Sequence, residues 1–200
     1  MFRMMKPGIY ILFFSLLLLA AYVVFRHLVR RVYLKEGRLT WLSTSLQLII
    51  IGGVIAFPYL FYPPEWPWFW RLEGDARSGL HITGMIVIVS GFLVAIGTMV
   101  WFGLRRAFGF EVKDLVRNGP YRFTRNPQIL GGYLLVGGTV MQWPSWYGLG
   151  WILLYGLIGH WMILTEEEHL RSRFGEEYER YCGDTPRYLF AMKKPRRQPF

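Results

Sequence analysis

Long apolar stretches alternate with short polar segments along this chain, and the pattern predicts helices that cross a membrane. Four apolar blocks stand out, at residues 9–25, 39–62, 80–104 and 129–164. A helix needs roughly 20 residues to cross the hydrocarbon core, so each of the first three blocks predicts one helix. The first block runs directly into arginines rather than into a small-residue cleavage site, which favours an uncleaved helix over a secretory signal.

The fourth block is too long for one crossing, and it contains a break. Residues 142–148 include Pro144, Ser145 and Gly148, residue types that form turns. We therefore predict a helical hairpin with arms at 129–143 and 146–164, which makes about five membrane helices. At about 1.5 Å per residue the first arm spans roughly 22 Å, short of a core of about 30 Å. Short segments of this kind often mark a site inside the membrane, although its glycines also suit close helix packing.

Composition supports the membrane assignment. The chain is 53% hydrophobic and 18% charged, whereas soluble domains carry about 25% charge. This excludes a soluble globular protein, a disordered tail and a conventional nucleic-acid-binding domain. The single cysteine, Cys182, excludes a disulfide framework, and four widely separated histidines make a metal site improbable. We expect an all-α, polytopic integral membrane protein and no bound metal.

The net charge of +10 predicts an orientation. Nineteen of the 23 basic residues follow the first, third and fifth predicted helices. Because basic loops stay in the cytoplasm, we expect an outside N-terminus, a cytoplasmic C-terminus and a prokaryotic inner-membrane location. Aromatic residues in the outer loop, 62–78, suit the membrane interface. We divide the chain into residues 1–104, with three helices, and 105–200, with a cytoplasmic loop, the hairpin at 129–164 and a helical cytoplasmic tail.

Two polar stretches, 111–128 and 165–190, flank the hairpin, whose ends return to one membrane face. In the first, Asn126 can cap the helix that begins at Pro127. The positive helix end beside Arg125 suits an anion; the alternative is an ordinary cap among arginines attracted to anionic lipid. In the second, residues 166–168 are three adjacent glutamates.

The three glutamates oppose the helix dipole and repel one another. Glu167 and Arg171, four residues apart, offer partial relief. A cationic ligand would relieve the repulsion further; the alternative is a solvated helix end with ion pairs. Together, the basic and acidic groups match a zwitterion. Seven of the 13 acidic residues lie between Glu166 and Asp184, so the acidic group is a local exception in a basic chain.

The two stretches resemble a known superfamily. GPYRFTRNPQILGG, residues 119–132, and TEEEHLRSRFGEEYERYCGDTPRYLF, residues 165–190, are similar to the isoprenylcysteine carboxyl methyltransferase and phospholipid methyltransferase superfamily. Its pattern places Gly-x-Tyr and Arg-[His/Asn]-Pro before a hairpin, then Glu-Glu and Phe-Gly-x-x-Tyr after it. The chain departs from this pattern at Ile129, where the family has tyrosine, and at Asn126, where eukaryotic carboxyl methyltransferases have histidine. It also lacks an arginine just before Glu166.

The resemblance implies an enzyme of the EC 2.1.1 type that uses S-adenosylmethionine. It implies that Glu166 or Glu167 binds the amino group or ribose, and that Arg125 and Asn126 hold the carboxylate and position the donor. Tyrosines would pack on the adenine. The implied cofactor-binding residues are Gly119, Tyr121, Arg125, Asn126, Pro127, Gly131, Gly132, Glu166, Glu167, Tyr178 and Tyr181.

The expected acceptor is lipid-like or isoprenylated and enters from the bilayer, for carboxyl O-methylation or phospholipid N-methylation. The sequence does not name the acceptor atom or the oligomeric state. Two alternatives remain. One is an NADPH-dependent lipid or sterol-type reductase, which the glutamates fit poorly. The other is a non-enzymatic scaffold or transporter, for which polar residues inside the helices are few. No nucleic-acid partner is expected.

Overall fold

The computed structural model describes residues 7–60, 78–103, 106, 109–110, 114–142 and 144–188, and this part of the chain contains helices and no strand. The predicted outer loop and the last part of the basic tail lie outside it. The elements, in order, are α1 (Pro7–Tyr22), the π-helical η1 (Val23–Val29), α2 (Arg30–Glu36), α3 (Trp41–Ala56), the 3-10 helix η2 (Phe57–Leu60), α4 (Ser78–Phe102), the 3-10 helix η3 (Gly119–Arg122), α6 (Pro127–Gln142), α7 (Trp146–Phe174) and α8 (Glu176–Asp184).

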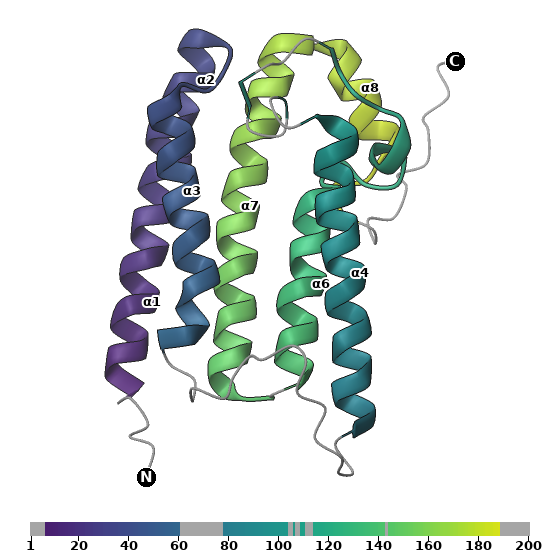
Figure 1. The fold of residues 1–200 in the computed structure, drawn as a ribbon. Coiled ribbons are helices and arrows are strands. Elements are labelled where there is room, and N and C mark those ends of the chain that lie inside the picture. Colours follow the sequence, from purple (N-terminus) through teal and green to yellow (C-terminus); the bar gives the residue numbers. More distant parts are fainter. Residues whose placement is uncertain are drawn as a thin grey trace, which may run out of the picture.

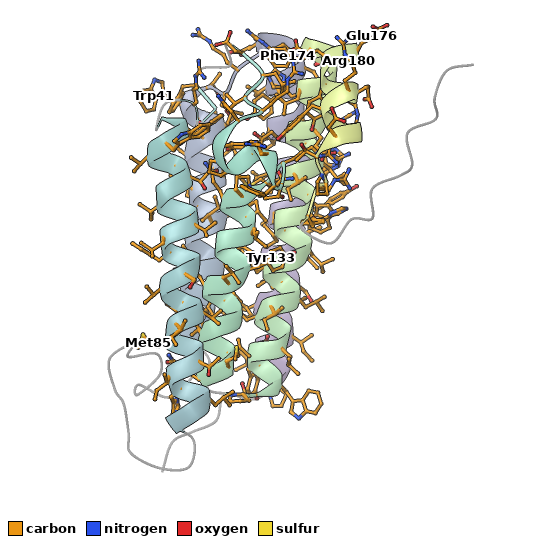
Figure 2. The ribbon with its side chains drawn as sticks, turned by 90° about the vertical axis from the view of Figure 1, so that its right-hand side faces the viewer. Trp41, Met85, Tyr133, Phe174, Glu176 and Arg180 are labelled. Carbon is orange, nitrogen blue, oxygen red and sulfur yellow. The ribbon has the colours of Figure 1, made fainter. Side chains whose placement is uncertain are left out.

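The long helices lie side by side, and the polar elements gather at one end of the bundle. Figure 1 shows α1, α3, α7, α6 and α4 aligned along one axis, with α2, α8 and the segment between α4 and α6 at the same end. Nitrogen- and oxygen-bearing side chains crowd this end, where Phe174, Glu176 and Arg180 lie, while Met85 lies toward the other end (Figure 2). We call it the charged end.

Many large apolar side chains along the bundle are exposed, as expected for helices that meet lipid. Within the described residues, three helices are long and apolar enough to cross a membrane: Pro7–Glu36, Gly79–Phe102 and Trp146–Phe174. Helix α3 is apolar but shorter, and α6 has 16 residues. Membrane helices are therefore present, while the count of five crossings stays a prediction.

The first helix is longer than its apolar block, and here the sequence interpretation was wrong. The arginines after residue 25, expected in a loop, lie within η1 and α2, so the helix continues to Glu36. Arginine, lysine and glutamate are good helix formers, so charge alone does not end a helix. The helix ends at Gly37, whose φ of 66° provides the left-handed C-cap.

The hairpin has the predicted position but a longer second arm. The Ser145 side chain accepts a hydrogen bond from the Gly148 N–H and so caps α7. Helix α7 continues ten residues beyond the predicted end at residue 164 and stops at Phe174, before Gly175. Its 29 residues span about 43 Å, more than a hydrocarbon core of about 30 Å. The glutamate cluster is consequently presented on a helix rather than in a tail.

Helices α4 and α6 pack backbone to backbone through glycines. A Cβ added to Gly91 would lie 2.6 Å from the Gly131 carbonyl oxygen, and one added to Gly84 would lie 2.7 Å from the Gly138 carbonyl oxygen. These glycines are seven residues apart on each helix, so they recur on one face. Small residues permit this close approach in membranes. The packing explanation for Gly131 and Gly138 is confirmed.

The N-terminal helices attach to α7 near the charged end. Arg26 Nη2 lies 2.7 Å from Glu168 Oε1, and Arg30 Nε bonds to the other carboxylate oxygen. The Thr165 hydroxyl donates to the Phe25 carbonyl oxygen at 3.0 Å. Lower in the bundle, Trp151 Nε1 donates to the Val54 carbonyl oxygen at 2.8 Å. The first three contacts hold η1 and the start of α2 against the end of α7 that carries the glutamates, and the fourth joins α7 to α3.

Candidate active site

The two polar stretches that flank the hairpin meet at the charged end, as their topology predicts. The Arg125 N–H donates to the Pro186 carbonyl oxygen at 3.0 Å, and the Tyr181 hydroxyl donates to the Tyr121 carbonyl oxygen at 2.8 Å. The Thr124 hydroxyl donates to the Arg187 carbonyl oxygen at 3.0 Å. Residues 185–188, which we call the C-terminal strap, are thereby fastened to the segment that enters α6.

A cavity of about 70 Å³ lies between these stretches and α7. Seven of the predicted cofactor-binding residues line it: Tyr121, Arg125, Asn126, Glu166, Glu167, Tyr178 and Tyr181. The remaining lining residues, which the sequence interpretation did not include, are Tyr33, Phe102, Arg106, Gly109, Asp114, Leu115, Val116, His169 and Leu170.

Glu167 is buried and paired with arginines from three segments. Its carboxylate lies 2.9 Å from Arg125 Nη1 and accepts two hydrogen bonds from Arg187, at 2.9 and 2.6 Å. Arg171, one turn along α7, lies 3.7 Å away, which confirms the predicted i,i+4 pair. Only 2% of the Glu167 side chain is exposed. The carboxylate therefore joins the segment before α6, the strap and α7.

Glu166 has a different environment although it is the preceding residue. Successive residues on an α-helix point about 100° apart, and this rotation takes Glu166 away from the arginines and into the cavity. The residue is exposed to solvent while it lines the cavity. Within the described part of the chain, its carboxylate has no hydrogen bond or ion pair. Glu166 is the carboxylate available to a cationic ligand.

Three tyrosines form the aromatic wall of the cavity. Tyr178 and Tyr181 lie one turn apart on α8, with ring centroids 6.1 Å apart in an edge-to-face arrangement. Burial raises the pKa of Tyr121, Tyr178 and Tyr181, and the Glu166 carboxylate adds to this for Tyr121. Their hydroxyls stay protonated at neutral pH. The wall therefore offers neutral aromatic faces, which suit an aromatic base or a cation.

Arg125 and Asn126, the two residues before α6, hydrogen-bond to α8 and to the strap. Arg125 Nη1 donates to Cys182 Sγ at 2.8 Å and to the Tyr178 hydroxyl at 3.4 Å, while its buried Nε has no partner. The side-chain amide of Asn126 donates, through Nδ2, to the Arg187 carbonyl oxygen at 3.2 Å. The predicted helix-capping role of the Asn126 side chain stays a prediction. The unpaired Nε leaves one donor for a ligand.

Four predicted cofactor-binding residues do not line the cavity: Gly119, Pro127, Gly131 and Gly132. Packing explains the three glycines. Gly119 has a φ of +58° and lies against Trp101, and a Cβ on Gly132 would lie 1.8 Å from the Tyr155 hydroxyl oxygen. Gly131 lies against α4, as described above. A direct contact of these four residues with a ligand stays a prediction.

The most informative residue that the sequence interpretation missed is His169. It lies three residues after Glu166 and therefore on a neighbouring part of the same helix face, a spacing that the TEEEH segment already contains. Its ring stacks on Tyr33, with centroids 4.4 Å apart. No pattern connects Tyr33 with residues more than 130 positions later. Among the described residues, no three His, Cys, Asp or Glu side chains gather as a metal site requires.

Comparison with known proteins identifies the family. Residues 78–177, half of the chain, match the phospholipid methyltransferase family. The chain belongs to this family. An uncharacterized protein of Haemophilus influenzae is 36% identical over 62 residues, which cover 28% of this chain and 98% of that protein. No solved structure matches the chain.

The phospholipid methyltransferase match begins at α4 and ends within α8. It thus contains the glycine-packed helix pair, the hairpin, Arg125 and all three glutamates. Membership in the family, together with the apolar helices, makes this an integral membrane protein of a methyltransferase family. Helices α1, α2 and α3 lie outside the matched segment, although α2 contributes Tyr33 to the cavity. The strap, residues 185–188, lies outside it as well.

Proposed function

We propose that the protein is an integral membrane methyltransferase that takes its methyl group from S-adenosylmethionine and transfers it to a lipid-like acceptor. The observation that carries the proposal is the cavity at the charged end of an apolar bundle. It combines an unpaired carboxylate, Glu166, with an unpaired guanidinium donor, Arg125 Nε, and an aromatic wall. Most of these groups come from the segment that matches the family.

The charged and aromatic side chains that line the cavity fit S-adenosylmethionine. The methionine part of the cofactor carries an ammonium and a carboxylate, and its sulfur is a sulfonium cation. Glu166 supplies the anionic contact for a cation, and Arg125 Nε supplies a donor for a carboxylate. Tyr121, Tyr178 and Tyr181 supply faces for adenine or for the sulfonium. Glu167, which is already matched by three arginines, supports the site by holding its walls together.

The size of the cavity implies movement on binding. About 70 Å³ accommodates a few water molecules, whereas sites for drug-sized ligands measure roughly 300–1,000 Å³. The strap has no helical structure and is fastened by individual contacts to Thr124, Arg125, Asn126 and Glu167. The strap does not itself line the cavity, but it fastens three residues that do, Arg125, Asn126 and Glu167, and its displacement would disrupt no helix.

The chemistry requires positioning more than acid–base catalysis. When bound, S-adenosylmethionine supplies a methyl group that is already activated, so alignment for an in-line displacement dominates the rate. Glu166 and Arg125 orient the two charged ends of the donor. The tyrosine wall excludes water from the reacting face. A carboxylate acceptor needs no general base, and an amine acceptor needs only to be neutral.

We further propose that the charged end faces the cytoplasm, with the N-terminus outside, because the basic residues are concentrated there. The acceptor then reaches the site from the bilayer, between α4, α6 and α7. The exposed apolar side chains on α4 and the first half of α7 give a lipid chain a surface to follow. Either an oxygen or a nitrogen acceptor is compatible with this route.

Two measurements test the proposal. Purified protein in detergent should bind S-adenosylhomocysteine in calorimetry, with NADPH as the competing ligand. Incubation with labelled S-adenosylmethionine and a total lipid extract should then label a lipid, which mass spectrometry identifies. Binding of NADPH alone would replace the proposal with a reductase. Binding of neither compound, with no labelled product, would favour a scaffold or transporter.

A further inference from the structure

His169 is a buried imidazole whose hydrogen-bonding capacity is unused. It lies on α7, and only 2% of the residue is exposed. Neither Nδ1 nor Nε2 has a hydrogen-bond partner within the described part of the chain. The residue nevertheless lines the cavity, together with Glu166 on the preceding turn. A buried imidazole and a carboxylate that has no ion pair in the described part of the chain thus line the same space.

The missing partners are energetically significant. Leaving a buried polar group unpaired destabilises the fold, and folded proteins pair most such groups. A neutral imidazole presents one donor and one acceptor. The ring is fixed by packing, because it stacks on Tyr33 with an interplanar angle of 14°. Both nitrogens are therefore held in place and left for a molecule that enters the cavity.

The element that fixes the ring comes from outside the family match. Tyr33 belongs to α2, which other contacts attach to this end of the bundle. The Leu39 N–H donates to the Gly109 carbonyl oxygen at 3.0 Å, and Arg173 Nη1 donates to the Gly37 carbonyl oxygen at 3.3 Å. With the ion pairs of Glu168, these contacts determine where Tyr33 lies relative to His169.

We propose that His169 hydrogen-bonds directly to the molecule that this cavity binds, and that α2 forms part of the binding site by holding the imidazole through Tyr33. This rests on the proposed function. Two groups suit the pair: an amino group, which donates one hydrogen to an imidazole nitrogen and another to the Glu166 carboxylate, and a hydroxyl, which donates its hydrogen to the carboxylate and accepts one from the imidazole N–H. Such a group is present on the ribose of the methyl donor and on the polar head of many lipids.

The test compares His169→Phe with His27→Phe in the full-length protein. Phenylalanine retains the stack on Tyr33 but removes both nitrogens. His27 is a matched control because it also packs on a tyrosine, Tyr22, with centroids 5.4 Å apart, but it is exposed and does not line the cavity. S-adenosylhomocysteine binding by calorimetry and the KM for the acceptor lipid identified by the labelling experiment are measured for both variants. His169→Gln, which retains a donor and an acceptor, should recover part of any loss.

Weaker S-adenosylhomocysteine binding by about tenfold in His169→Phe, with wild-type binding in His27→Phe, would support the proposal and identify the donor as the partner. Unchanged binding with a KM for the acceptor raised about tenfold would support it and identify the lipid head. Unchanged binding and unchanged KM would overturn it. Failure of the wild-type protein to bind S-adenosylhomocysteine is a separate result, which removes the proposed function and this inference together.

A measurement on the wild-type protein covers the case in which the His169 variants do not fold. Nitrogen NMR of protein labelled only at histidine reports the four imidazole rings, and single substitutions of His27, His81 and His160 assign His169 by elimination. Addition of S-adenosylhomocysteine or of the lipid should shift the His169 ring nitrogens and leave those of His27 in place. Ring signals of His169 that do not move with either compound would contradict the proposal.

Discussion

Arg187 donates two hydrogen bonds to the carboxylate of Glu167, at 2.9 and 2.6 Å, and thereby ties the C-terminal strap to the C-terminal part of α7. The Glu167 side chain is 2% exposed, whereas that of Arg187 is 29% exposed. Arg125 approaches the same carboxylate from the start of α6. One buried charge therefore organises the segments that surround the candidate active site.

Replacing Glu167 should destabilise the protein as a whole. In Glu167→Gln, Arg125, Arg171 and Arg187 lose their shared anion, and removing one partner of a buried ion pair costs about 3–5 kcal/mol. We expect a large decrease in unfolding temperature in detergent. Glu179→Gln is the control, because Glu179 also pairs with Arg171 but its side chain is 58% exposed; exposed pairs contribute about 0–1 kcal/mol. Similar unfolding temperatures for the two variants would contradict the anchoring role.

Replacing Glu166 should leave the stability of the protein unchanged or slightly higher and weaken ligand binding. The Glu166 carboxylate has no ion pair in the described part of the chain and adjoins the charged Glu167. Glu166→Gln removes this repulsion, so we expect an unchanged or slightly raised unfolding temperature. Because the variant also removes the anionic contact in the cavity, binding of S-adenosylmethionine should weaken at least tenfold in calorimetry. Wild-type affinity in Glu166→Gln would mean that the ligand does not use this carboxylate.

The contact between α4 and α6 should not tolerate a methyl group. The Cβ of Gly91→Ala would lie 2.6 Å from the Gly131 carbonyl oxygen and 2.7 Å from the Leu135 amide nitrogen. Backbone atoms cannot turn away as a side chain can, so the helices must separate, and overpacking typically costs about 1–3 kcal/mol. Gly97→Ala, on the same helix, has no atom within 4 Å of its Cβ. It should be neutral or stabilising, because alanine favours helices over glycine. Thermal unfolding of both variants provides the comparison.

Cys182 should react slowly at neutral pH. Burial raises the pKa of its thiol, and this outweighs the opposing effect of the Arg125 guanidinium. The thiol form therefore predominates at pH 7, and the thiolate, which is the nucleophile, increases only at alkaline pH. We expect the rate of alkylation by iodoacetamide, followed by intact mass, to keep rising above pH 9. Cys182 is the only cysteine in the sequence, so no variant is needed. A rate that levels off near pH 7 would show a lowered pKa instead.

Sequence alone was sufficient for the long helices and for the convergence of the polar stretches. Apolar runs of membrane-spanning length and a Pro-Ser break are local features that can be recognised in the sequence. A helical hairpin returns its two ends to one side of the bundle, regardless of which side chains it carries. The sequence interpretation considered packing only for the glycines of the hairpin, since small residues allow helices to approach, and it did not single out their partners on α4, Gly84 and Gly91. The membership of Tyr121, Arg125, Tyr178 and Tyr181 in one site followed from family-like motifs.

Tertiary structure decided which glutamate has no ion pair in the described part of the chain and which residues complete the cavity. Glu166 and Glu167 are adjacent in the sequence and both line the cavity, but only the rotation of α7 against its neighbours places Glu167 against three arginines and leaves Glu166 without them. The contact of Tyr33 with His169 likewise depends on where α2 packs. The position of α2 results from side-chain contacts between segments far apart in the chain, such as the ion pairs that Arg26 and Arg30 form with Glu168. A local sequence pattern therefore carries no information about where α2 packs.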